Sequence, residues 1–202
     1  MSARPKLVVG LGNPGREYDG TRHNIGFAAL DRLADELGCS FRSKSRFSAS
    51  VAEAGVGDAG KVTLAKPRTF MNRSGSAVQA LLVWLKIEPG QLLVVVDDAD
   101  LPLGQLRMRP EGSSGGHHGL ESVEQHLATR GYPRLRLGIG RRTEDQREIT
   151  DYVLGRFEAA ERGTMEEVLD RAVRQVECWL SAGISEAMNE FNGAVAAQKG
   201  KQ

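Results

Sequence analysis

The stretch "KLVVGLGNPGREYDGTRHN" (residues 6–24) decides how this chain is interpreted. Its apolar run Leu7–Leu11 is typical of a buried strand, and Gly10–Gly15 matches the G-x-G-x-x-G pattern of dinucleotide-binding turns. That use requires a helix directly after the glycines and an acidic residue at the end of a second strand about 20 residues later. Here a polar turn follows the glycines, and Asp31 and Asp35 fall on the polar face of a predicted helix. The glycine turn therefore does not predict a nucleotide cofactor.

The rest of the chain alternates between predicted strands and helices. Apolar runs and period-two alternation predict strands over residues 7–11, 47–56, 61–66, 92–97, 104–109 and 135–140. Helical periodicity predicts helices over residues 21–37, 74–87, 116–127, 159–180 and 184–191. This order indicates an α/β fold, with a twisted mixed, mostly parallel sheet flanked by helices on both faces. We expect one domain over residues 1–193 and a disordered tail over residues 194–202.

Composition limits the functional classes. The 202 residues carry a formal net charge of +1, but residues 104–142 hold seven Arg against three acids, which indicates a local basic face. Cys39 and Cys178 match no metal or redox spacing and are typical of reduced thiols in a cytoplasmic protein. The N-terminal segment lacks a signal-peptide pattern, and no apolar run approaches 18 residues. The sequence predicts a cytoplasmic protein without a membrane span.

Polar side chains follow two of the predicted strands. Asn13 and His23 come after the first strand, and Asp97 ends the strand over residues 92–97. Ligands of such sheets bind outside the carboxyl ends of the strands, so these groups are expected near one another. A histidine base, a carboxylate that orients it and nearby carboxamides suit the activation of water. Each residue also has a structural alternative, as a helix-start histidine, a strand-end cap or a turn residue.

The Gly-rich segment "GSSGGHHG" (residues 112–119) offers a second candidate site. It satisfies the G-x-S-x-G pattern of a nucleophile elbow around Ser114. A hydrolase triad also needs an acid and a histidine downstream, but beyond this segment only His126 remains, on the same predicted helix. Small residues at a helix start better suit an anion cradle, or a flexible lid. The histidines here match no metal-binding spacing, so we expect no metal.

Several segments taken together resemble bacterial-type peptidyl-tRNA hydrolases. In order they read "GLGNPGREYDGTRHNIGF", "KPRTFMNRSGSAV", "VVVDDADLPLGQLRMR", "GSSGGHHGLESV", "PRLRLGIGR" and "DYVLGRF". The resemblance extends from about residue 5 to residue 193. It implies cleavage of the ester between a peptide and the 3′ ribose of tRNA, which releases tRNA for reuse in translation, with no metal or other cofactor. The family also includes non-catalytic, intron-splicing relatives, and this alternative would be favoured by loss of His23, Asp97 or Asn72, all of which are present.

The resemblance also implies roles for residues around the expected site. His23 is similar to the general base that activates water, and Asp97 to the carboxylate that orients it. Asn13 resembles the residue that distinguishes N-blocked from free aminoacyl groups. Asn72 resembles the carboxamide that binds near the scissile carbonyl. Without the resemblance, Asn13 and Asn72 remain ordinary turn or cap residues.

A second group of residues is implied to contact peptide or RNA. Tyr18 and Phe70 resemble residues that line the site for the peptide and the tRNA 3′ end, and Arg107 and Arg136 those that meet tRNA phosphate. His118 departs from the family pattern, because it stands where an Asn helps to bind tRNA and the water. The expected partner is peptidyl-tRNA, through its acceptor stem and 3′ end. No obligate protein partner is evident, and a monomer is expected.

Overall fold

The computed structural model describes residues 5–57, 60–141 and 146–195. Within them one sheet holds eight strands in the order β2-β3-β4-β1-β5-β7-β6-β8. The central strands run parallel to one another: β4 (Lys61–Pro67), β1 (Lys6–Gly10), β5 (Leu92–Asp98) and β7 (Arg134–Gly138). The outer strands are antiparallel to their neighbours: β2 (Arg42–Lys44), β3 (Ala49–Gly55), β6 (Gln105–Arg109) and β8 (Gly193–Ala194).

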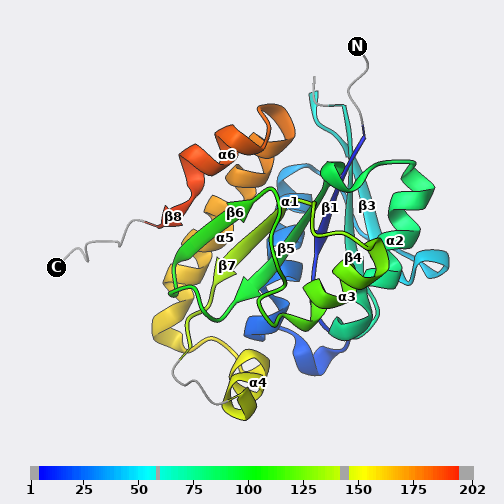
Figure 1. The fold of residues 1–202 in the computed structure, drawn as a ribbon. Coiled ribbons are helices and arrows are strands. Elements are labelled where there is room, and N and C mark those ends of the chain that lie inside the picture. The colour runs from blue at the N-terminus through cyan, green and yellow to red at the C-terminus, as the bar shows by residue number, and fades with distance from the viewer. Residues whose placement is uncertain (1–4, 58–59, 142–145, 196–202) are drawn as a thin grey trace.

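Helices cover both faces of the sheet (Figure 1). One face packs against α1 (Ile25–Glu36), α5 (Ala159–Ser181) and α6 (Ile184–Phe191). The other packs against α2 (Ser74–Leu85) and α3 (His118–Leu127). Because successive strand residues point to opposite faces and both faces are covered, the buried strands β1 and β5 are apolar at most positions. The described helices include none long and apolar enough to cross a membrane.

The glycines of the opening stretch allow close packing. A Cβ atom at Gly10 would lie 2.2 Å from the carbonyl oxygen of Gly26, and one at Gly26 would lie 2.5 Å from the carbonyl oxygens of Leu11 and Val95. The start of α1 therefore rests directly on the ends of β1 and β5. Gly15 has φ +119, a conformation that favours glycine. The pattern thus places the segment before α1 at the carboxyl end of the sheet.

The structure corrects several predicted boundaries. The helix expected from Thr21 begins as a 3-10 turn, η2 (Arg22–Asn24), and α3 begins at His118 instead of 116. Three elements were not predicted from the sequence: β2, β8 and a helix α4 (Gln146–Leu154). The expected tail is wrong at its first residues, because Ala194 pairs with β6 and Val195 N–H donates to a carbonyl of the chain. Residues 196–202 of that tail lie outside the described residues.

Candidate active site

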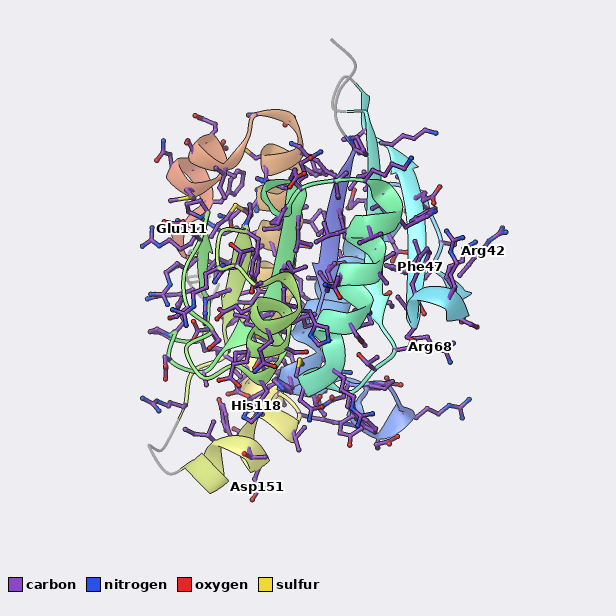
Figure 2. All side chains as sticks on the ribbon, turned by 45° about the vertical axis from the view of Figure 1, so that its right-hand side comes forward. Arg42, Phe47, Arg68, Glu111, His118 and Asp151 are labelled. Carbon is purple, nitrogen blue, oxygen red and sulfur yellow. The ribbon has the colours of Figure 1, made fainter. Side chains whose placement is uncertain are left out.

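A pocket of about 380 Å³ opens at the carboxyl ends of β1 and β5. Its lining includes seven of the nine residues predicted for the site, namely Asn13, His23, Phe70, Asn72, Asp97, His118 and Arg136. Tyr18 and Arg107 are not among the lining residues. Figure 2 shows His118 at this end of the molecule, between the sheet and α4, which carries Asp151. The structure thus brings together residues that are far apart in the sequence.

His23 and Asp97 form a hydrogen-bonded pair in this pocket. His23 lies in η2 and Asp97 near the end of β5, and the His23 Nδ1 to Asp97 Oδ1 distance is 2.9 Å. Asp97 is 2% exposed, so its carboxylate is shielded from water. When Nδ1–H donates to this carboxylate, the neutral ring keeps the lone pair of Nε2 for accepting a proton. The pair has the arrangement of an oriented general base.

His117 binds the same carboxylate oxygen and was missed as a site residue in the sequence. Its Nε2 lies 3.1 Å from Asp97 Oδ1, and its Nδ1 accepts hydrogen bonds from the N–H groups of Gly119 and Leu120 as the N-cap of α3. Because Nδ1 is an acceptor, Nε2 carries the proton and donates to Asp97. The only sequence signal for this role was a histidine at a predicted helix start, where capping residues occur.

The same bonding argues against a metal centre here. One nitrogen from each of His23 and His117 and one oxygen of Asp97 lie within 4.8 Å of one another, which is suitable spacing for ligands. A metal on His117 Nε2 would need the lone pair there and would move the proton to Nδ1. Nδ1 would then face two N–H donors. The hydrogen-bonded form of the cluster is therefore the better fit to its surroundings.

The surroundings of Asp97 and His23 shift the pKa of each. Burial alone would raise the pKa of Asp97, but the charges and hydrogen bonds of His23 and His117 hold it well below its usual range. Burial lowers the pKa of His23, whereas the charge and hydrogen bond of Asp97 raise it, and the net effect is an increase. Asp97 is therefore ionised at neutral pH and stabilises the imidazolium of His23.

Asn13 is fixed by three hydrogen bonds. Its side-chain Oδ1 accepts from the N–H of Met71 at 2.8 Å. Its backbone N–H donates to Asn24 Oδ1 at 2.8 Å, and its carbonyl accepts from Asn24 Nδ2 at 2.9 Å. With Oδ1 engaged, Nδ2 is the polar group that Asn13 can offer to the pocket it lines. Asn13 is thus held as a hydrogen-bond donor.

Apolar walls flank these polar groups. Phe70, before the 3-10 turn η5 (Met71–Arg73), is 56% exposed and lines the pocket next to Asn72, which is also exposed. Across the pocket, α4 contributes the apolar side chains of Ile149, Val153 and Leu154. The pocket can therefore hold a ligand with an apolar part and a polar centre.

The two predicted phosphate-binding arginines differ in their surroundings. Arg136 is held inside the protein: its Nη1 lies 3.1 Å from Asp98 Oδ2, and its Nη2 donates to the carbonyls of Ser113 and Ser114 at 2.8 and 3.0 Å. Its side chain is 11% exposed, against 44% for Arg107, whose Nη2 lies 3.4 Å from the same oxygen of Asp98. Arg136 thus ties the Gly-rich segment to the end of β5, whereas Arg107 is open to solvent.

The remaining predicted residues lie at the margin of the site. His118 is the first residue of α3, is exposed and lines the pocket. Its ring makes no hydrogen bond or ion pair to the part of the chain that the structure describes. Tyr18 lies in the 3-10 turn η1 (Arg16–Tyr18) and is half-buried. Its carbonyl accepts from both the N–H and the hydroxyl of Thr21, which fixes the turn before His23.

Comparison with known proteins shows which family the chain resembles. The family model "Peptidyl-tRNA hydrolase" matches residues 7–201. A peptidyl-tRNA hydrolase of Synechococcus sp. (strain JA-3-3Ab) is 51% identical over 93% of this chain and 82% of its own. One from Synechocystis sp. (strain ATCC 27184 / PCC 6803 / Kazusa) is 48% identical over 93% of this chain and 96% of its own.

Solved structures give the same result for the fold. A crystal structure of a peptidyl-tRNA hydrolase complex with N-propanol is similar with a TM-score of 0.90 and 32% identity, covering 97% of this chain and 99% of that one. Peptidyl-tRNA hydrolase from Acinetobacter baumannii gives 0.89 and 33%, covering 96% and 97%. The predicted α/β class with a mixed sheet is confirmed. The sequence resemblance is confirmed as well: this chain belongs to the peptidyl-tRNA hydrolase family.

Proposed function

We propose that this chain hydrolyses the ester bond between a peptide and the 3′ ribose of tRNA, with His23 as the general base. The observation that carries the proposal is the 2.9 Å contact between His23 Nδ1 and the buried carboxylate of Asp97, in a pocket that the carboxamides of Asn13 and Asn72 also line. His23 Nε2 takes a proton from water as its oxygen attacks the ester carbonyl. The imidazolium then returns a proton to the departing 3′ oxygen. The products are a free carboxylic acid and a free ribose hydroxyl.

Asp97 and His117 support this step without contacting the substrate's reacting atoms. Asp97 fixes the tautomer of His23 and stabilises the imidazolium that forms during water attack. His117 donates to the same oxygen of Asp97 that His23 contacts, and so helps to keep the carboxylate in place. No metal or other cofactor is required for this chemistry.

The two carboxamides give the site its preference for blocked substrates. Asn13 presents an amide N–H donor, which can bond to the carbonyl of an N-acyl group. A free ammonium carries only donors, so it would face a donor and lose its hydration. Asn72 is exposed and lines the pocket, which supports a role in binding the substrate near the scissile carbonyl. Phe70 offers an apolar surface to the peptide or to the terminal base.

The RNA part of the substrate extends beyond the pocket. Arg107 is the more accessible of the two predicted phosphate contacts, and Arg136 acts on RNA mainly by holding the Gly-rich segment in place. His118 borders this segment and can contact a ribose hydroxyl or phosphate, and Tyr18 lies in a turn outside the lining of the pocket. We propose that the protein works as a monomer in the cytoplasm, where translation supplies peptidyl-tRNA.

The proposal is tested by incubating the protein with N-acetyl-aminoacyl-tRNA and, separately, with the unblocked aminoacyl-tRNA. Release of free tRNA from the first alone is the expected result. Asn13→Ala should reduce the ratio of the cleavage rate of the blocked substrate to that of the unblocked one, because the amide donor of Asn13 is lost. Binding of tRNA without cleavage of either substrate would instead favour a non-catalytic RNA-binding role. No observation in the pocket supports that role.

A further inference from the structure

Arg22 lies next to the proposed base, and only 4% of it is exposed. Full burial is rare for a guanidinium without partners. Its Nη2 lies 2.6 Å from Glu161 Oε2 in the first turn of α5, and its Nη1 donates to the carbonyl of Arg156. The rings of Tyr152 and Phe157 lie 4.3 and 5.1 Å from its Cζ. Four partners therefore hold this side chain in one place.

The backbone makes the same connection between the two segments. The N–H of Arg22 donates to the carbonyl of Gly155 at 2.9 Å, and Thr21 forms an isolated antiparallel bridge with Arg156. Tyr152 is itself anchored, because its hydroxyl donates to the carbonyl of Ile139 at 2.8 Å. The turn that carries His23 and the end of α4 are thus joined through both main chain and side chain.

This junction connects two parts of the pocket. Val153 and Leu154 of α4 line the pocket, and Tyr152, directly before them, packs on Arg22. His23, directly after Arg22, lines the same pocket. A shift of α4 would therefore be transmitted to the base through one buried side chain.

We infer that Arg22 is a positioning residue that fixes the His23 imidazole relative to the α4 wall of the pocket. The inference rests on the proposed role of His23. Stability alone does not account for the arrangement, because Arg22 Nε is buried without a hydrogen-bond partner among the described residues. A base misplaced by about 1 Å can lose 10²-fold in rate, so a rigid link between base and wall has a direct effect on turnover.

The test is Arg22→Gln, assayed with N-acetyl-aminoacyl-tRNA. We expect kcat to fall by about 10- to 100-fold, with a smaller change in KM. In a His23→Ala background the same substitution should have almost no further effect on kcat, because the group that it positions is gone. Effects that multiply in the double variant, or an unchanged kcat in the single variant, would overturn the inference.

Arg32→Gln is the matched control. Arg32 joins α1 to the same helix α5, through ion pairs with Glu166 and Asp170, but it touches neither η2 nor the pocket. Its loss should leave kcat at the wild-type value. If the Arg32 variant lowered kcat as much as Arg22→Gln, a general loosening of α5 would explain both results and the inference would fail.

Two further measurements keep the test decisive. If Arg22→Gln does not fold, Glu161→Gln takes its place, since it removes the charge that pairs with Arg22 and keeps an oxygen acceptor. For this variant we expect a several-fold loss of kcat, and a wild-type kcat would contradict the inference. The wild type and His23→Ala are assayed alongside. A wild type that cannot cleave the blocked substrate would overturn the proposed function itself. An active wild type with an unaffected Arg22→Gln would overturn only the role of Arg22.

Discussion

Replacing His117 with Asn separates its two structural roles. The Asn side chain can still accept from the N–H groups of Gly119 and Leu120, because Asn is a favoured N-cap residue. It is too short to replace the ring Nε2 that donates to Asp97 at 3.1 Å. His117→Asn therefore keeps the helix cap and removes one of the two side-chain donors to the carboxylate.

The magnitude follows from the lost hydrogen bond. A hydrogen bond to a charged group contributes about 1.5–3 kcal/mol. If about half of this reappears as stronger pairing of Asp97 with the His23 imidazolium, the pKa of His23 rises further by about 0.5–1 unit, at about 1.4 kcal/mol per unit. The raised pKa of His23 already reflects the Asp97 charge acting against burial. Loss of His117 should therefore move the pKa of His23 upward, the same direction in which Asp97 already shifts it.

The assay is kcat/KM against pH, from pH 5 to 8, for wild type and His117→Asn on N-acetyl-aminoacyl-tRNA. The acid limb should move to higher pH by about 0.5–1 unit, with most of the activity retained above it. The melting temperature should fall by only a few degrees, because the cap is kept and about half of the lost hydrogen-bond energy is recovered. Superimposable acid limbs, or an acid limb that moves to lower pH, would refute this account of the cluster.

Three other predictions concern the same site. Arg107→Ala should raise KM for full-length tRNA substrates and reduce the log–log salt slope by roughly 0.7–0.9, and more than Arg136→Ala does; equal slopes in wild type and Arg107→Ala would place the phosphates elsewhere. His118→Asn should keep or increase activity near neutral pH, because a carboxamide both donates and accepts hydrogen bonds; a large loss would show that the site depends on imidazole. The pKa of His23 is raised in the folded state, so its contribution to stability is full below about pH 6.5 and is lost as the pH rises through the folded-state pKa. The difference in melting temperature between wild type and His23→Ala should therefore shrink from pH 5.5 to pH 8.5, and a constant difference would contradict this prediction.

The alternation of apolar runs and helices in the sequence was sufficient to predict the class of fold. Residues 92–97 were expected as a central strand ending in an acid, and β5 does place Asp97 at the pocket. The short elements were not predictable in the same way. β2 is three exposed residues, and β8 is two residues paired to β6, so neither has an apolar pattern to reveal it.

The predicted site residues came largely from the order of polar groups after strands and from the family resemblance. Seven of them line the pocket, but their partners could not be read from the sequence. His117 acts through a tautomer that two backbone N–H groups impose, which is a property of the folded helix start. Arg136 was expected at phosphate, yet Asp98 and two loop carbonyls surround its guanidinium. The contacts of Arg136 join residues more than twenty positions apart, beyond the reach of local patterns.

The central claim is that His23 is the general base, and the turnover of His23→Ala tests it most directly. The measurement is single-turnover cleavage of N-acetyl-aminoacyl-tRNA at saturating enzyme, together with the dissociation constant for uncharged tRNA. The account predicts a rate lower by at least about 10²-fold, with an unchanged dissociation constant, because the ring touches the water and not the RNA backbone. A variant that keeps more than about a tenth of the wild-type rate would contradict the claim.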